Sequence, residues 1–121
     1  MQQEIFLDYS YTTLNEYIKK ERIPRQGMYI ANALKKQETN ATALFVRNLE
    51  KYNTSVELEF QHHEIQLNKD LDNMAFRQKA IIDGLVKAGI LKNDGLRWVK
   101  KITHTCIRDK KIGITLTIKN I

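Results

Sequence analysis

The sequence predicts an α+β fold, a single domain over residues 1–121 in which helices pack on a mixed β-sheet. Residues 55–62 alternate between apolar and polar side chains, as a half-buried strand does. Residues 73–88 space their apolar side chains as an amphipathic helix does. Residues 96–106 and 112–119 look like two closing strands joined by the polar turn RDKK. The expected order is strand, helix, helix, strand, helix, strand, strand.

The N-terminal half supplies the first three elements. Residues 3–9 (QEIFLDY) predict a short strand, and TTLNEYIKKERIP predicts a short helix that threonine caps and Pro24 ends. Residues 28–51 predict a second helix, and ETNAT is the point at which it could break. Its apolar residues recur at helical spacing: Met28, Ala31, Leu34, Leu44, Val46 and Leu49.

The central strand and the following helix show the clearest patterns. Val56, Leu58 and Phe60 point to one side of the strand, and the glutamates between them point to the other. The helix over residues 73–88 ends at Gly89, a common C-terminal residue. Five of its apolar side chains are expected to face the core: Met74, Ile81, Ile82, Leu85 and Val86.

Composition is that of an ordinary globular protein, with 42% hydrophobic residues, one proline and five glycines. No apolar run is long enough to span a bilayer, so we expect a soluble, cytoplasmic protein without a membrane partner. The lone Cys106 has no partner for an internal disulfide. Because it alternates with Ile102 and His104, it is expected to be a small buried side chain.

Positive charge is concentrated in one segment. Residues 69–111 hold eleven Lys and Arg against five Asp, a balance of +6, whereas the rest of the chain holds nine basic and nine acidic residues. Localised positive charge favours an anionic partner, most often nucleic acid. A solvated face that keeps the protein soluble is the alternative.

The KDLDN segment, residues 69–73, opens this basic region with two carboxylates. If it is extended, Asp70 and Asp72 point to the same side and Leu71 points into the core. Two such carboxylates repel each other unless a cation lies between them, and oxygen ligands suit Mg²⁺ or Mn²⁺. The alternative is helix capping by Asp72 or Asn73, which the helix dipole would favour.

Asp94 and Lys79 extend this candidate site. Asp94 could be a further ligand on a loop, although Asn-Asp-Gly is also common turn chemistry. Lys79 is expected on the helix face of Asp72, two turns on, with Arg77 as a competitor on another face. The alternative for Lys79 is an i,i+4 ion pair with Asp83.

Histidines and aromatic residues are weaker candidates. His62 and His63 end a strand and point to opposite faces, so packing or solvent exposure is expected for both; His104 has no assigned role. Trp98 and Tyr29 could stack on bases. Trp98, however, alternates with Leu96 and Ile102 and is expected in the core.

The stretch DLDNMAFRQKAIIDGLVKAGILKNDG resembles the RusA family of Holliday junction resolvases, which is typically met in phages and prophages. The likeness lies in the D-x-D-N turn, a helix with a lysine and an Asp-Gly-Leu segment, an Ala-Gly-aliphatic stop and an aspartate in the next loop. TLNEYIKKER adds a weaker match. The lysine stands two helical turns after the second aspartate rather than one, and Asn93 replaces a frequent acid.

The resemblance implies a Mg²⁺-dependent endonuclease, with Mn²⁺ as a substitute, that resolves four-way DNA junctions by paired incisions in recombination and repair. It implies a homodimer in the cytoplasm of a bacterial host, possibly encoded by a phage or prophage. Asp70, Asp72 and Asp94 would hold the metal, and Lys79, or else Arg77, would be the catalytic cation. The DNA contacts would come from the basic segment: Lys69, Arg77, Lys87, Lys92, Arg97, Lys100 and Lys101. The alternatives are a related nuclease for forks or flaps, and a non-catalytic DNA-binding module.

Overall fold

A computed structural model describes all 121 residues and confirms the α+β class, with a mixed four-stranded sheet. Its elements follow the predicted order, except that two short helices replace the one expected over residues 73–88. They are β1 (Gln2–Leu7), α1 (Leu14–Glu21), α2 (Gly27–Val46), β2 (Val56–Glu64), α3 (Leu71–Ala75), α4 (Gln78–Lys87), β3 (Val99–Arg108) and β4 (Gly113–Asn120).

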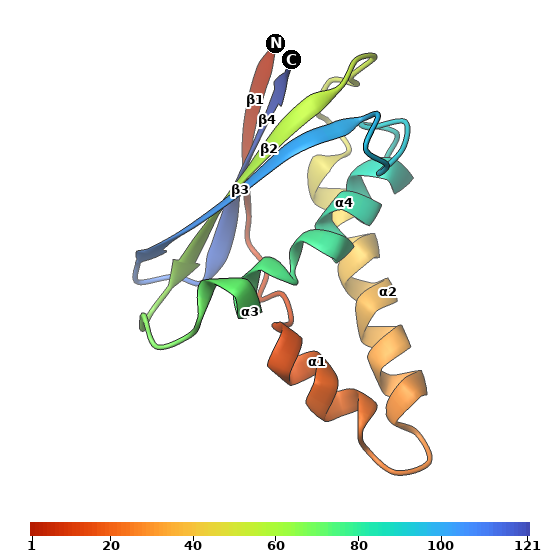
Figure 1. The fold of residues 1–121 in the computed structure, drawn as a ribbon, viewed down its shortest axis with the longest axis vertical. Coiled ribbons are helices and arrows are strands. Elements are labelled where there is room, and N and C mark those ends of the chain that lie inside the picture. Colours follow the sequence, from red (N-terminus) through yellow and green to blue (C-terminus); the bar gives the residue numbers. More distant parts are fainter.

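The strands lie in the order β1-β4-β2-β3. β4 is antiparallel to both β1 and β2, and β2 is parallel to β3. The parallel pair is connected through α3 and α4, which is the long crossover that parallel neighbours need. The two termini lie side by side at one end of the sheet (Figure 1).

One face of the sheet forms the core with α4. Val56, Leu58 and Phe60 of β2 are buried on this face, as the alternation predicted. Ile81 and Leu85 of α4 are fully buried in the same apolar cluster, and Met74 is buried as well. The apolar pattern of residues 73–88 therefore predicted the buried side correctly.

α2 runs unbroken through ETNAT. Glu38 and Thr42 are buried there, and the Thr42 hydroxyl donates to the Glu38 carbonyl at 2.9 Å. Tyr11 and Thr42 share a further buried hydrogen bond of 2.6 Å. The polar residues that suggested a break are thus satisfied inside the protein, and the helix continues past them.

The α1–α2 hairpin projects away from the sheet (Figure 1). Thr13 and Glu16 form a capping box at the start of α1, which confirms the predicted threonine cap. After Pro24 the chain turns through Arg25, whose φ of 69° is in the left-handed region. A Cβ on Gly27 would lie 2.2 Å from the Glu21 carbonyl oxygen, so this turn requires glycine.

The helix expected over residues 73–88 changes its hydrogen bonding near Arg77. The Arg77 amide donates to Met74 at 3.0 Å and the Lys79 amide donates to Phe76 at 3.3 Å. These are i to i−3 bonds, which tighten the helix locally. This tight turn separates α3 from α4 near Arg77, whose side chain is buried in the core.

The stretch before β3 differs from the prediction. β3 begins only at Val99, so Leu96 and Trp98 lie in the preceding turn, where Leu96 is 88% exposed. Trp98 is partly exposed, with the Lys92 ammonium 5.4 Å from its ring centre. Cys106 is also partly exposed, because it lies on an edge strand instead of a central one.

None of the helices is both long enough and apolar enough to cross a membrane.

The close contact of α2 with α4 depends on Gly84. A Cβ at this position would lie 2.4 Å from Thr42 Cβ. We predict that Gly84→Ala lowers the free energy of unfolding by about 1–3 kcal/mol, although alanine is the better helix former. Gly95→Ala is the control, because its Cβ would meet no atom closer than 3.4 Å. Denaturant unfolding measures both, and equal stability of the two variants would contradict the close packing.

Candidate functional site

Asp70 and Asp72 begin α3 and are both exposed. Asp70 is the extended N-cap residue, whereas Asp72 is already in the first helical turn. The expectation of an extended KDLDN segment therefore holds at Asp70 only. Leu71, expected in the core, is 42% exposed.

Neither of these two carboxylates has an ion-pair partner. Asp83 and Asp94, by contrast, form ion pairs with Lys79, and Asp109 is hydrogen-bonded to His63. Lys69, directly before Asp70, lies 3.5 Å from Glu64 instead. Two neighbouring negative charges are thus left open to solvent at the start of a strongly basic segment.

Helix capping does not account for Asp70. Although it occupies the N-cap position of α3, its side chain makes no capping hydrogen bond. Asp72 Oδ1 accepts a bond of 2.9 Å from the Asn73 amide. The capping alternative therefore applies in part to Asp72, whereas the Asp70 side chain makes no capping hydrogen bond.

Asn73 joins this segment to α1. Its Oδ1 accepts the Asn15 amide at 2.8 Å, which satisfies one of the free N–H groups in the first turn of α1. One turn further along, the rings of Tyr17 and Phe76 lie 5.1 Å apart. The two contacts hold the N-terminal end of the projecting hairpin against the exposed aspartates.

Arg77 is buried, with 2% exposure. Its Nε donates to the Tyr11 carbonyl at 2.9 Å, and one terminal nitrogen lies 3.1 Å from Glu64 Oε1. The other terminal nitrogen lies 3.4 Å from His62 Nδ1. Protein groups therefore occupy the whole guanidinium, and no DNA contact or catalytic contact through Arg77 is available in this arrangement.

A chain of partly buried hydrogen bonds continues from Arg77. His62 Nε2 lies 2.9 Å from His104 Nδ1, and His104 Nε2 lies 2.7 Å from Gln78 Oε1. Burial, and then the Arg77 charge, lower the pKa of His62 to about 3, and burial also lowers the pKa of His104. His62 is therefore the neutral acceptor that a guanidinium neighbour requires.

His62 and His63 do lie on opposite faces of β2, and packing is confirmed for both because both are buried. His63 lies 2.9 Å from Asp109 and 2.7 Å from the Thr115 hydroxyl. The hydrogen bond from His63 holds the pKa of the Asp109 carboxyl below its usual range. Neither histidine is free to bind a metal.

Lys79 contacts two carboxylates. Its ammonium lies 3.1 Å from Asp83 and 3.3 Å from Asp94, and its side chain is 52% exposed. The hydrogen bond to Asp83, and secondarily that to Asp94, raises the pKa of Lys79. The i,i+4 pair with Asp83 was the predicted structural role, while the contact with Asp94 brings two of the candidate site residues together.

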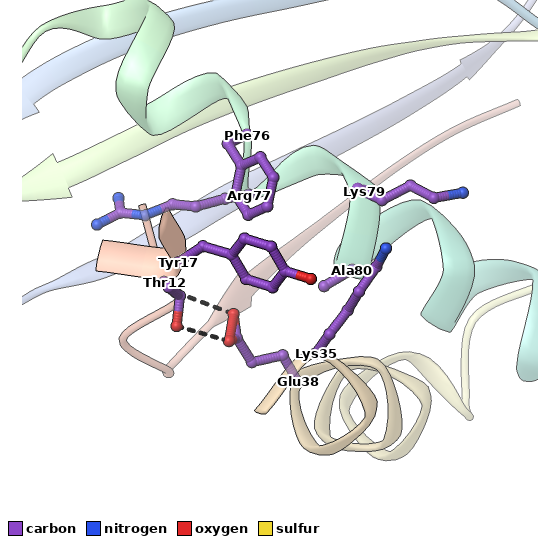
Figure 2. Close-up of a pocket in the computed structure, with 8 residues that line it drawn as sticks. All are labelled: Thr12, Tyr17, Lys35, Glu38, Phe76, Arg77, Lys79 and Ala80. Atoms are coloured by element: carbon purple, nitrogen blue, oxygen red, sulfur yellow. Dashed lines mark hydrogen bonds between the residues drawn. The ribbon is translucent and has the colours of Figure 1, made fainter. Parts of the chain in front are cut away.

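A narrow cleft lies between α1, α2 and the α3–α4 junction. Figure 2 shows the Tyr17 ring between Phe76 and a hydrogen-bonded pair formed by Thr12 and Glu38. The Thr12 amide and hydroxyl donate to the Glu38 carboxylate at 2.9 and 2.8 Å, and burial raises the pKa of Glu38. The cleft has a free volume of about 10 Å³, which accommodates one water molecule at most, so no base or nucleotide can enter it.

The three predicted metal ligands are not gathered into one site. No group of three or more His, Cys, Asp or Glu side chains that could hold a metal ion forms anywhere in the chain. Asp94 instead faces Lys79, in a turn that Asn93 stabilises by accepting the Gly95 amide at 2.9 Å. Of the three predicted ligands, Asp70 and Asp72 are the two that have no ion-pair partner.

The predicted DNA contacts are exposed, apart from Arg77. These exposed side chains are Lys69, Lys87, Lys92, Arg97, Lys100 and Lys101. The main features that the sequence did not indicate are the buried charges Glu38, Glu64 and Arg77. Their polar partners come from other parts of the chain, so no local pattern in the sequence indicated their burial.

A comparison of the sequence with protein-family models finds no match, and no curated protein matches it significantly. The likeness to the RusA pattern therefore depends on the quoted residues themselves.

We predict that Arg77→Met destabilises the protein by about 3 kcal/mol, because it leaves the buried Glu64 carboxylate without its main partner. Arg97→Met, at an exposed site, should change stability by less than about 0.5 kcal/mol. Urea unfolding of both variants measures the difference. An Arg77→Met protein as stable as Arg97→Met would show that the buried pair contributes nothing.

We predict an acid-sensitive stability that depends on His62. The pKa of His62 is about 3 in the folded protein against 6.5 when unperturbed, so the unfolded chain binds more protons between these values. The His62 contribution is complete above pH 6.5 and is lost as the pH falls toward 3.

Unfolding free energy measured across this range should fall by up to about 1.4 kcal/mol per pH unit. The variant His62→Gln, which cannot titrate, should show a shallower fall until the carboxylates begin to protonate. His104 contributes with the same sign and stays in both proteins. Parallel profiles for the two proteins would rule out His62 as the source.

Proposed function

We propose that this chain is a metal-dependent endonuclease that cuts branched DNA, with the four-way junction as its preferred substrate. The observation that carries the proposal is the pair of exposed aspartates, Asp70 and Asp72, which lack any cationic partner within a basic segment. The two carboxylates are two residues apart in the sequence, both are exposed, and neither is neutralised by a lysine or arginine, so both remain available to a cation from solvent. The order of motifs that resembles the RusA pattern supports the same activity.

Asp70 and Asp72 are the residues that would hold Mg²⁺ or Mn²⁺. Magnesium commonly takes only one or two protein carboxylates and completes its octahedron with water and substrate phosphates, so a two-aspartate site is chemically sufficient. When bound, such an ion activates a water and stabilises the leaving oxygen of a phosphodiester. Asp94 could join as a third ligand only after release from Lys79.

Lys79 would offset the negative charge that develops on the phosphate. Its raised pKa keeps the ammonium protonated, and Asp83 and Asp94 restrict its position. Half of its side chain is open to solvent, so a phosphate could reach it without rearrangement of the core. In this proposal Asp83 and Asp94 position the lysine ammonium.

The exposed lysines and arginines of residues 69–111 would hold the DNA backbone without reading sequence. A symmetric junction requires two cuts, so the active form in this proposal is a C2 homodimer with one site in each subunit. We place the activity in recombination and repair, in the cytoplasm of a bacterial host, with a phage or prophage as the source of the gene.

A second candidate is a non-catalytic DNA-binding module, which the absence of a gathered three-carboxylate group favours. A nuclease of the same type that prefers forks or flaps is a variant of the first proposal. Cleavage of a panel of branched substrates, with and without chelator, distinguishes all three.

We predict that Asp72→Asn lowers single-turnover cleavage of a four-way junction by about 100-fold or more, because the cation site loses one of its charges. Asp70→Asn should do the same. Junction binding should persist or tighten, since the basic surface is intact and one repulsive charge is gone. Mg²⁺ and Mn²⁺ should support cleavage, and Ca²⁺ should support binding better than cleavage.

The matched control is Glu50→Gln, which makes the same charge change at an exposed carboxylate with no side-chain hydrogen bond. It should leave cleavage unchanged. Full cleavage by a folded Asp72→Asn protein, or full activity of the wild type in excess chelator, would contradict the catalytic proposal. Binding without any cleavage in the wild type would favour the second candidate.

A further inference from the structure

The charge balance outside residues 69–111 conceals a second basic region. Residues 19–36, here called the arm, comprise the end of α1, the turn and the first half of α2, and they carry six basic residues against one glutamate. The six are Lys19, Lys20, Arg22, Arg25, Lys35 and Lys36, and none of them forms an ion pair. All except the partly buried Lys35 are exposed.

Apolar side chains are exposed among these charges at the apex of the arm. Tyr29 is 81% exposed, Met28 68% and Ile23 41%. Tyr29 borders a shallow groove of about 440 Å³ whose other lining residues include Arg25 and Ile30. An exposed aromatic ring between unpaired cations is the arrangement with which proteins bind single-stranded nucleic acid, by stacking on bases and contacting phosphates.

Arg25 adds a conformational observation. Its φ of 69° is in the left-handed region, which glycine adopts at much lower cost than arginine. The turn therefore holds a long cationic side chain at a position where the backbone conformation would favour glycine. Strain of this kind at an exposed turn indicates a role for the side chain.

The arm is anchored beside the exposed aspartates. Helix α1, whose last residues belong to the arm, is held at its start by the Asn15–Asn73 hydrogen bond and the Tyr17–Phe76 contact, and it then leads away from the sheet (Figure 1). The eight residues of α1 extend for about 12 Å. This length corresponds to about three to four nucleotides of a DNA strand.

We propose that the arm binds an unpaired strand of DNA, with Tyr29 stacked on a base and Arg25 and its neighbouring cations on the phosphates. If the proposed nuclease function holds, this strand leaves the branch point next to Asp70 and Asp72, so substrates with unpaired nucleotides at the branch are favoured. The location at a branch rests on that function, whereas single-strand binding by the arm does not.

An anionic membrane surface fits the arm less well. Within the arm only the three apex residues are large, apolar and exposed, and the exposed residues that follow them on α2 include Asn32, Lys36 and Gln37. The next exposed apolar side chains, Leu44 and Phe45, lie beyond this polar stretch. An interfacial helix needs a continuous apolar face to bury among lipid chains. Charge complementarity combined with a single exposed aromatic ring therefore favours nucleic acid.

The test is fluorescence anisotropy with a labelled thymidine oligonucleotide of about 20 nucleotides and with a duplex of equal length. Tyr29→Ala should weaken single-strand binding about tenfold or more, change duplex binding by less than about twofold, and keep the wild-type thermal midpoint. Tyr29→Phe should restore binding, because it keeps the stacking ring.

Arg25→Gly removes the cationic side chain while glycine keeps the conformation of the turn, so it tests the charge without disturbing the fold. It should lower the salt dependence of single-strand binding by about one phosphate contact, while the thermal midpoint stays equal or rises as the turn relaxes. Unchanged single-strand affinity of Tyr29→Ala would overturn the proposal. The proposal would also be overturned if Tyr29→Ala weakened binding to phosphatidylserine vesicles but left single-strand binding unchanged.

Asp72→Asn keeps the two proposals distinguishable. It should abolish cleavage yet bind the oligonucleotide at least as tightly as the wild type. If the wild type never cleaves while Tyr29→Ala weakens single-strand binding, the nuclease proposal is refuted and the proposal for the arm is supported. Cleavage with no effect of Tyr29→Ala on single-strand binding would refute the arm alone.

Discussion

The buried ion pair between Arg77 and Glu64 is the interaction on which the arrangement of the candidate site depends. Arg77 is 2% exposed and Glu64 3%, and the guanidinium also reaches His62 and the Tyr11 carbonyl. Charged groups this deeply buried are stable only when each is paired and hydrogen-bonded. Arg77 therefore joins the α3–α4 junction to the end of β2 and to the segment that precedes α1.

This constraint explains the exposure of the aspartates. Because the Arg77 side chain enters the core, the helix tightens by i to i−3 bonds and α3 becomes a separate short helix. Glu64 takes Lys69 as its second cation, so the lysine next to Asp70 does not neutralise it. Asn73 and Phe76 then face α1 and fix the start of the projecting arm. The open carboxylates and the arm thus follow from one internal contact.

Local patterns predicted the sheet and its core. Val56, Leu58 and Phe60 predicted a half-buried strand, and Ile81 and Leu85 predicted a buried helix face. A threonine predicted the start of the first helix. Each of these signals depends on residues within a few positions, which is the range that a sequence pattern can report.

Features that depend on distant partners could not be predicted in this way. Arg77 looked like a surface cation because Tyr11, its carbonyl acceptor, lies 66 positions away. The ETNAT segment was expected to break the helix because the Thr12 groups that satisfy Glu38 come from the segment between β1 and α1, distant in the sequence. Leu96 seemed to continue the alternation of β3, but the preceding turn leaves it exposed. The net charge summed over all residues outside 69–111 is zero, because acidic residues elsewhere balance the cations of the arm, so this sum did not reveal the basic arm.

The central claim is that Asp70 and Asp72 form a cation site on the surface. The most direct measurement is a titration of the ¹⁵N-labelled protein with Mn²⁺, whose paramagnetism broadens the amide signals of nearby residues. The account predicts that the signals of residues 69–73 broaden first and that Mg²⁺ in excess restores them. Broadening that leaves residues 69–73 unaffected would contradict the claim, and so would equal broadening in Asp70→Asn/Asp72→Asn protein.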